Sequence, residues 1–114
     1  MHETMVAQSL IDIIMTEAVK QKATPLSAKI SCGTLNPVND EVLRFAFEAV
    51  AKGTSCEGVE LHIEHKPIRA RCTDCGCEFE VEFSDPACPA CKIGAFKLLP
   101  DAPLIIEEIS FQTD

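Results

Sequence analysis

Four of the seven cysteines lie in two pairs that share one spacing. Cys72 and Cys75 form the first Cys-x2-Cys pair, and Cys88 and Cys91 form the second after twelve intervening residues. A two-residue turn directs both thiolates of a pair at one ion, and two pairs joined by a hairpin complete the tetrahedron that Zn(II) prefers in structural sites. We therefore predict a closed zinc site with a structural role.

Redox chemistry is the alternative interpretation of a Cys-x2-Cys spacing. A dithiol redox pair usually occurs once, at the start of a helix, and needs a cysteine of low pKa, which a bound metal would quench. Cys77 follows the first pair at a spacing unsuited to the same turn, so we leave it out of the zinc site. We expect Cys32 in a strand and Cys56 in a loop, neither with a neighbouring histidine that would make it a nucleophile.

The amino terminus carries a second set of metal donors. The free amine of Met1, the backbone nitrogen of residue 2 and the imidazole of His2 can close fused chelate rings around one ion. Such a planar, nitrogen-rich donor set suits Ni(II) or Cu(II) better than zinc. Glu3 adds a carboxylate, and the bulk of His2 should hinder removal of Met1. On spacing alone, a solvated terminal histidine is the alternative.

Two further histidines, His62 and His65, lie three residues apart in a predicted strand. Positions three apart on a strand point to opposite faces, so the two rings cannot easily chelate one ion. We expect a pair of surface histidines.

Apolar spacings of three and four residues predict two helices. The first covers residues 4–22 and ends before Thr24-Pro25, because the residue before a proline avoids the helical conformation. The second starts at Asn39 or Asp40, either of which can cap it, and stops at Gly53.

Alternating apolar residues predict three strands, at residues 26–32, 59–63 and 104–111, with a turn at 33–37 after the first. The side chains expected on one face are Leu26, Ala28, Ile30 and Cys32 in the first strand and Ile105, Ile109 and Phe111 in the last. Two helices on a small three-stranded sheet can share one core, so we predict an α+β fold.

Residues 68–99 hold five of the seven cysteines and little continuous apolar sequence. We expect a strand of Phe79, Val81 and Phe83 between the cysteine pairs, and a turn at Asp85-Pro86. A piece this small needs a metal to fold. We therefore predict a zinc-ribbon domain with four cysteine ligands at residues 67–103, inserted into an α+β domain that is formed by residues 1–66 plus 104–114 and carries the metal donors of the amino terminus.

The charge balance argues against nucleic-acid binding. The chain has 18 acidic and 10 basic residues, no Trp and no Tyr, and residues 68–99 hold four bases against five acids. Phosphate-backbone binding needs clustered basic residues instead. The sequence has no apolar run long enough to span a membrane and no basic leader before an apolar stretch, so we expect a cytoplasmic protein.

Taken together, these motifs resemble the HypA/HybF family of hydrogenase nickel-insertion proteins. The resemblance is carried by Met1-His2-Glu3, both cysteine pairs and residues 33–38, 43–48, 53–54 and 57–61. It implies a nickel-delivering metallochaperone, not an enzyme. Ni(II) would be transient cargo bound by Met1, His2 and Glu3, and Zn(II) would be structural at the four paired cysteines.

The family also implies partners: the maturation GTPase, the large subunit of [NiFe]-hydrogenase and, in some organisms, urease maturation proteins. We expect a monomer or a weak homodimer. The alternative function is a zinc-ribbon module for protein interaction or regulation that delivers no nickel.

The sequence departs from the family pattern around the ribbon. Lys92 follows the second cysteine pair where family members usually have glycine, and residues 101–104 replace the usual Gly-x-Glu-Leu. Cys77 is an addition, and residues 76–87 contain no histidine that could close over nickel. Asp40, at the start of the second helix, is either a further nickel ligand or only a helix cap.

Overall fold

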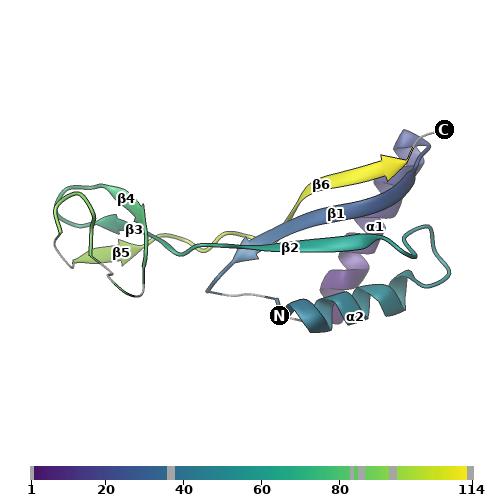
Figure 1. Ribbon diagram of the computed structural model, residues 1–114, viewed down its shortest axis with the longest axis horizontal. Coiled ribbons are helices and arrows are strands. Elements are labelled where there is room, and N and C mark those ends of the chain that lie inside the picture. The colour runs from purple at the N-terminus through teal and green to yellow at the C-terminus, as the bar shows by residue number, and fades with distance from the viewer. Residues whose placement is uncertain (1, 36–37, 83, 85–86, 93–94, 113–114) are drawn as a thin grey trace.

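The computed structural model describes residues 2–35, 38–82, 84, 87–92 and 95–112. The molecule is elongated, with principal extents of 54 × 27 × 18 Å, and has a lobe at each end (Figure 1). The elements are α1 (Glu3–Gln21), β1 (Thr24–Gly33), α2 (Asp40–Ala51), β2 (Glu60–Lys66), β3 (Arg69–Cys72), β4 (Glu78–Glu80), β5 (Phe96–Leu98) and β6 (Ile105–Gln112). We call α1, α2, β1, β2 and β6 the helical lobe, and β3, β4 and β5 the ribbon lobe.

The helical lobe is a three-stranded sheet with strand order β2-β1-β6, covered by two helices. The central strand β1 pairs parallel with β2 and antiparallel with β6. Helices α1 and α2 pack against each other, and their buried side chains join Ala28, Ile30 and Leu61 of the sheet in one core. This arrangement confirms the predicted α+β class.

Both predicted helices form, and local chemistry sets their ends. Lys22 adopts a left-handed conformation (φ 53°), and its backbone N–H bonds to carbonyls of the last turn of α1. Asn39 caps α2, because its side-chain oxygen accepts a hydrogen bond from the N–H of Val42 at 3.0 Å. Asp40 is therefore the first helical residue and not the cap.

Two predicted core positions are wrong because the pairing of β1 with β6 contains two bulges. Leu26 is an extra residue between the pairs Pro25–Phe111 and Ser27–Ser110, and it is 46% exposed. An extra residue shifts the side-chain alternation by one position.

The second bulge lies at Glu107, between the pairs Lys29–Glu108 and Ile30–Ile106. It turns Ile106 toward the core in place of Ile105, which is 45% exposed. Ile109, beyond the bulge, packs against the core as predicted.

The predicted turn at residues 33–37 also starts differently, because Gly33 is the last residue of β1. Its N–H donates to the carbonyl of Ala102 at 2.9 Å, and a Cβ at this position would collide with the carboxylate of Asp101. A larger residue at position 33 would therefore require the Asp101 side chain to move. Asn36 and Pro37 lie outside the described residues.

The ribbon lobe is a separate antiparallel sheet with strand order β4-β3-β5. Its small core contains Ala70, Phe79 and two cysteines, and Phe79 meets Phe96 edge to face at 5.9 Å. The predicted strand from Phe79 to Phe83 is shorter than expected, since β4 ends at Glu80. Phe83 and the predicted turn at Asp85-Pro86 lie outside the described residues.

No helix among the described residues is long and apolar enough to cross a membrane.

Substitutions on α2 test the position of the core. Leu43 is fully buried, whereas Phe45 is 75% exposed. We expect Leu43→Ala to lower the free energy of unfolding by about 2–5 kcal/mol, because it leaves a cavity. The matched control Phe45→Ala should change it by less than about 0.5 kcal/mol. Urea unfolding followed by circular dichroism measures both, and equal losses would show that this face of α2 is misplaced.

Candidate metal centres

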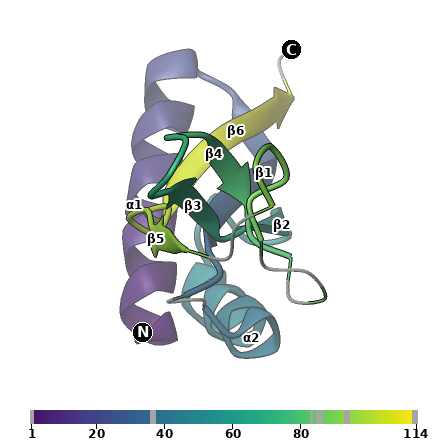
Figure 2. The same ribbon diagram turned by 90° about the vertical axis from the view of Figure 1, so that its left-hand side faces the viewer.

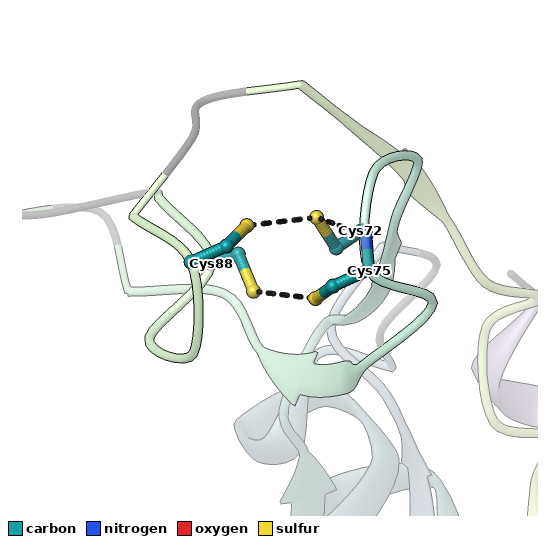
Figure 3. A group of neighbouring side chains, drawn as sticks. Cys72, Cys75 and Cys88 are labelled. Atoms are coloured by element: carbon teal, nitrogen blue, oxygen red, sulfur yellow. Dashed lines mark hydrogen bonds between the residues drawn. The ribbon is translucent and has the colours of Figure 1, made fainter.

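The structure brings together the four cysteines predicted as zinc ligands. The Sγ atoms of Cys72 and Cys91 lie 3.3 Å apart, those of Cys75 and Cys88 lie 3.6 Å apart, and all four lie within 4.8 Å of one another. Figure 3 shows the thiols of Cys72 and Cys75 facing the second cysteine pair, with the thiol of Cys75 opposite that of Cys88. Sulfur atoms about 2.3 Å from a tetrahedral zinc ion would be about 3.8 Å apart. The spacing therefore fits a zinc ion and exceeds the length of about 2.05 Å of a disulfide.

The two cysteine pairs are positioned by two equivalent turns. The N–H of Gly76 donates to the carbonyl of Cys72 at 3.1 Å, and the N–H of Lys92 donates to that of Cys88 at 2.7 Å. Gly76 and Lys92 are both left-handed, with φ of 74° and 59°. Lys92 thus adopts a conformation that favours glycine, which gives its departure from the family pattern a backbone consequence.

Backbone N–H groups around the cluster favour thiolates at two of its positions. Hydrogen bonds from the N–H of Cys91 and, less strongly, from that of Ala90 lower the pKa of Cys88 to about 6, although burial acts in the opposite direction. The N–H of Cys75 likewise lowers the pKa of Cys72. Charged acceptors are stabilised by such hydrogen bonds. At Cys75 the N–H of Cys77 acts in the same direction, but the neighbouring thiol of Cys88 and burial outweigh it and raise the pKa.

Cys77 lies beside this cluster without joining it. Its carbonyl accepts a hydrogen bond from the N–H of Cys72 at 2.9 Å, and its thiol is directed at the carbonyl of Glu78 at 3.6 Å. Its backbone therefore supports the first turn.

The predicted nickel donors begin at the first turn of α1. Met1 lies outside the described residues. His2 is exposed, its carbonyl accepts from the N–H of Val6 at 3.0 Å, and its side chain makes no capping hydrogen bond. Glu3 Oε2 is buried, and it has no hydrogen-bond partner within the described part of the chain. A buried carboxylate oxygen without a donor is costly and suits a metal ion.

Asp40 takes part in a contact that the sequence did not reveal. Its Oδ1 lies 2.7 Å from Nε2 of His65, and Nδ1 of the same ring lies 3.5 Å from Sγ of Cys32. The expectation that Cys32 has no neighbouring histidine is therefore wrong. Cys32 and His65 are register partners in the parallel pairing of β1 with β2, and that register could not be read from the sequence.

The two histidines of β2 do face opposite ways. His62 lies 3.5 Å from Glu60 on the solvent side, and its side chain is 55% exposed. The side chain of His65 is 34% exposed and lies between two protein partners. Both histidines are exposed, as predicted, but their rings lie in different environments.

An α+β lobe with an inserted ribbon that gathers four thiols defines a class of small metal-binding proteins. A family model described as hydrogenase/urease nickel incorporation, metallochaperone, hypA matches residues 1–111. The chain belongs to the HypA family of nickel-incorporation metallochaperones. This membership confirms the resemblance found in the sequence and a role in nickel delivery for hydrogenase maturation.

Individual relatives cover most or all of the chain. Hydrogenase maturation factor HybF of Escherichia coli O157:H7 is 34% identical over 113 residues, which are 98% of this chain and 100% of that protein. Hydrogenase maturation factor HypA of Geotalea daltonii is 40% identical over 91 residues, 80% of this chain and 81% of that protein.

A solved structure shares the fold. The solution structure of the Ni metallochaperone HypA from Helicobacter pylori matches with a TM-score of 0.65 at 20% identity, covering 100% of both chains.

The acidity of Cys88 can be measured in protein stripped of metal. The pKa of about 6 depends on the backbone N–H groups of the folded turn, so an alkylation rate that reaches half its maximum near pH 6 would show that this turn persists without metal. Cys56 is the control, because burial raises its pKa and should leave it unreactive. Peptide mass spectrometry after timed alkylation across a pH series resolves the two. Because the ribbon lobe is too small to fold without metal, we expect the midpoint in stripped protein to lie near the ordinary thiol value of about 8.5, and a midpoint near pH 6 would contradict this dependence on metal.

Proposed function

We propose that the chain binds Ni(II) through Met1, His2 and Glu3 and hands it to the maturation machinery. The observation that carries this proposal is the buried Oε2 of Glu3, without a hydrogen-bond partner among the described residues, next to the exposed side chain of His2. The free amine and backbone nitrogen would complete a nitrogen-rich set that Ni(II) accepts. An exposed, terminal site also suits cargo, since the ion has to leave.

Asp40 is the further ligand in this proposal. Its alternative role as a helix cap is filled by Asn39. Both views place the first turn of α1 beside the first turn of α2, which starts at Asp40 (Figures 1 and 2). A carboxylate at this turn can reach toward a metal bound at the amino terminus.

The four clustered cysteines are the proposed ligands of Zn(II). A set of four thiolates leaves no open position, so the ion would stabilise the ribbon and catalyse nothing. We further propose that residues 67–103 form a domain separate from residues 1–66 plus 104–114. The core of the ribbon lobe is too small to fold alone, which agrees with a metal-dependent domain.

Delivery would involve the maturation GTPase, the large subunit of [NiFe]-hydrogenase and, in some organisms, urease maturation proteins. We propose a binding protein without catalytic activity, active as a monomer or weak homodimer. We place it in the cytoplasm, because a reducing compartment keeps the clustered thiols available to a metal ion.

Nickel binding by tag-free protein with a native amino terminus tests the first site. We expect His2→Ala to weaken nickel binding by about tenfold or more, because a ligand is lost, while zinc content stays unchanged. The control is His62→Ala, which removes an exposed imidazole from the solvent side of β2. Competition with a chromophoric chelator gives the affinities, and elemental analysis gives the metal contents. Parent-like nickel binding by His2→Ala would contradict the site. The alternative function, an interaction module stabilised by zinc, would then be favoured.

Zinc content tests the second site. We expect Cys91→Ala to lose the single zinc ion, because three thiolates hold it more weakly, and to lose the folded signals of the ribbon lobe. The matched control Cys77→Ala, a neighbouring thiol outside the cluster, should keep its zinc. Two-dimensional amide spectra should show the helical lobe intact in both variants. Loss of the helical lobe with the zinc would argue against two domains.

A further inference from the structure

Three side chains from three elements of the helical lobe form a connected line. Cys32 comes from β1, His65 from β2 and Asp40 from the first turn of α2. Both nitrogens of the imidazole are engaged, Nδ1 at 3.5 Å from the Cys32 thiol and Nε2 at 2.7 Å from Asp40 Oδ1. Since the imidazole is rigid, two contacts on opposite edges leave it little freedom to turn.

One protonation pattern of Cys32, His65 and Asp40 gives every hydrogen bond a donor and an acceptor. A neutral imidazole with its proton on Nε2 donates to the carboxylate of Asp40, and its Nδ1 accepts from the thiol of Cys32. Cys32 is 1% exposed, so its thiol is fixed by the core packed around it. The line therefore starts from a rigid part of the molecule and ends at a half-buried carboxylate.

The contact lies where α2 meets the edge of the sheet. His65 is the last residue but one of β2, and Asp40 opens α2, so the hydrogen bond ties the first turn of the helix to the end of the strand. Nothing in helix capping requires this bond, because Asn39 already caps α2. A carboxylate held through Oδ1 can still offer Oδ2 to a metal ion.

We propose that His65 is a positioning residue for nickel binding, because its contacts with Cys32 and Asp40 hold the Asp40 carboxylate in one position at the first turn of α2. This inference rests on the proposed nickel site. Without the imidazole, the carboxylate of Asp40 would rotate freely and would lose side-chain entropy on binding the ion. Partners that orient a metal ligand typically contribute roughly ten- to a hundredfold in affinity.

Two amide replacements separate the two contacts of the ring. His65→Gln places an N–H donor close to the position of Nε2 and can still reach Asp40. His65→Asn places its amide near the position of Nδ1, reaching toward Cys32 but not toward Asp40. We expect His65→Ala and His65→Asn to weaken Ni(II) binding about tenfold, and His65→Gln to recover most of the parent affinity.

The measurement is a competitive nickel titration of the full, tag-free chain, with the nickel absorption and circular dichroism bands recorded at saturation. Asp40→Ala should weaken binding and alter the bands, and the double variant with His65→Ala should lose no more than Asp40→Ala alone. His62→Ala is the matched control and should behave as the parent. Zinc content and thermal unfolding report whether each variant is folded.

Several outcomes would overturn the proposal. Parent-like affinity in His65→Asn, failure of His65→Gln to recover binding in a folded protein, or additive losses from Asp40 and His65 would each show that the ring does not act through Asp40. Parent-like binding by Asp40→Ala would also overturn it. If His2→Ala still loses nickel in that case, the terminal site stands and only the role of Asp40 fails. If His2→Ala retains nickel too, the proposed site itself has failed.

Discussion

The pairing of β1 with both its neighbours is the constraint on which the rest of the molecule depends. The ribbon is inserted between β2 and β6, so the chain leaves the sheet on one side of β1 and returns on the other. Both connections pass the end of β1, where Thr34 donates to the carbonyl of Lys66 and Gly33 donates to that of Ala102. The same strand end brings Cys32 opposite His65. The register between β1 and β2 therefore sets the sheet, the positions of the two connections to the ribbon and the place of His65 beside Asp40.

The bulge at Glu107 lies near this strand end. It places Glu107 beside the buried Ser31, whose hydroxyl donates to the carboxylate at 2.6 Å. Lys66 of β2 lies 3.7 Å from the same carboxylate and 3.0 Å from Glu64, so polar groups cross the outer face of the sheet. The ion pairs are half exposed and contribute little, whereas the buried hydroxyl needs its partner. At the bulge, Glu107 has no strand partner in β1, but its carboxylate accepts the hydrogen bond that the buried hydroxyl of Ser31 needs.

The elements and the cysteine cluster could be predicted from the sequence, because both depend on local spacing. Helix periods, a cap at Asn39 or Asp40 and the doubled Cys-x2-Cys pattern need no knowledge of tertiary structure, and the structure selects Asn39 as the cap. The predictions for Leu26 and Ile105 are wrong because a bulge changes alternation without changing composition. The contact of His65 with Cys32 and Asp40 depends on a pairing across 33 and 25 residues, which no local pattern encodes.

The two sets of metal donors differ in the way that their proposed roles require. In the folded ribbon, backbone N–H groups favour thiolates at Cys72 and Cys88, and a set of four thiolates would leave bound zinc no open position for exchange. The imidazole of His2 is instead exposed at the end of the chain, where an ion can be reached by a partner. In the proposed site, the Asp40 carboxylate, held from the core through His65, would add a less mobile ligand to this exposed donor. Such a combination would favour capture of nickel while leaving an exposed route for its transfer.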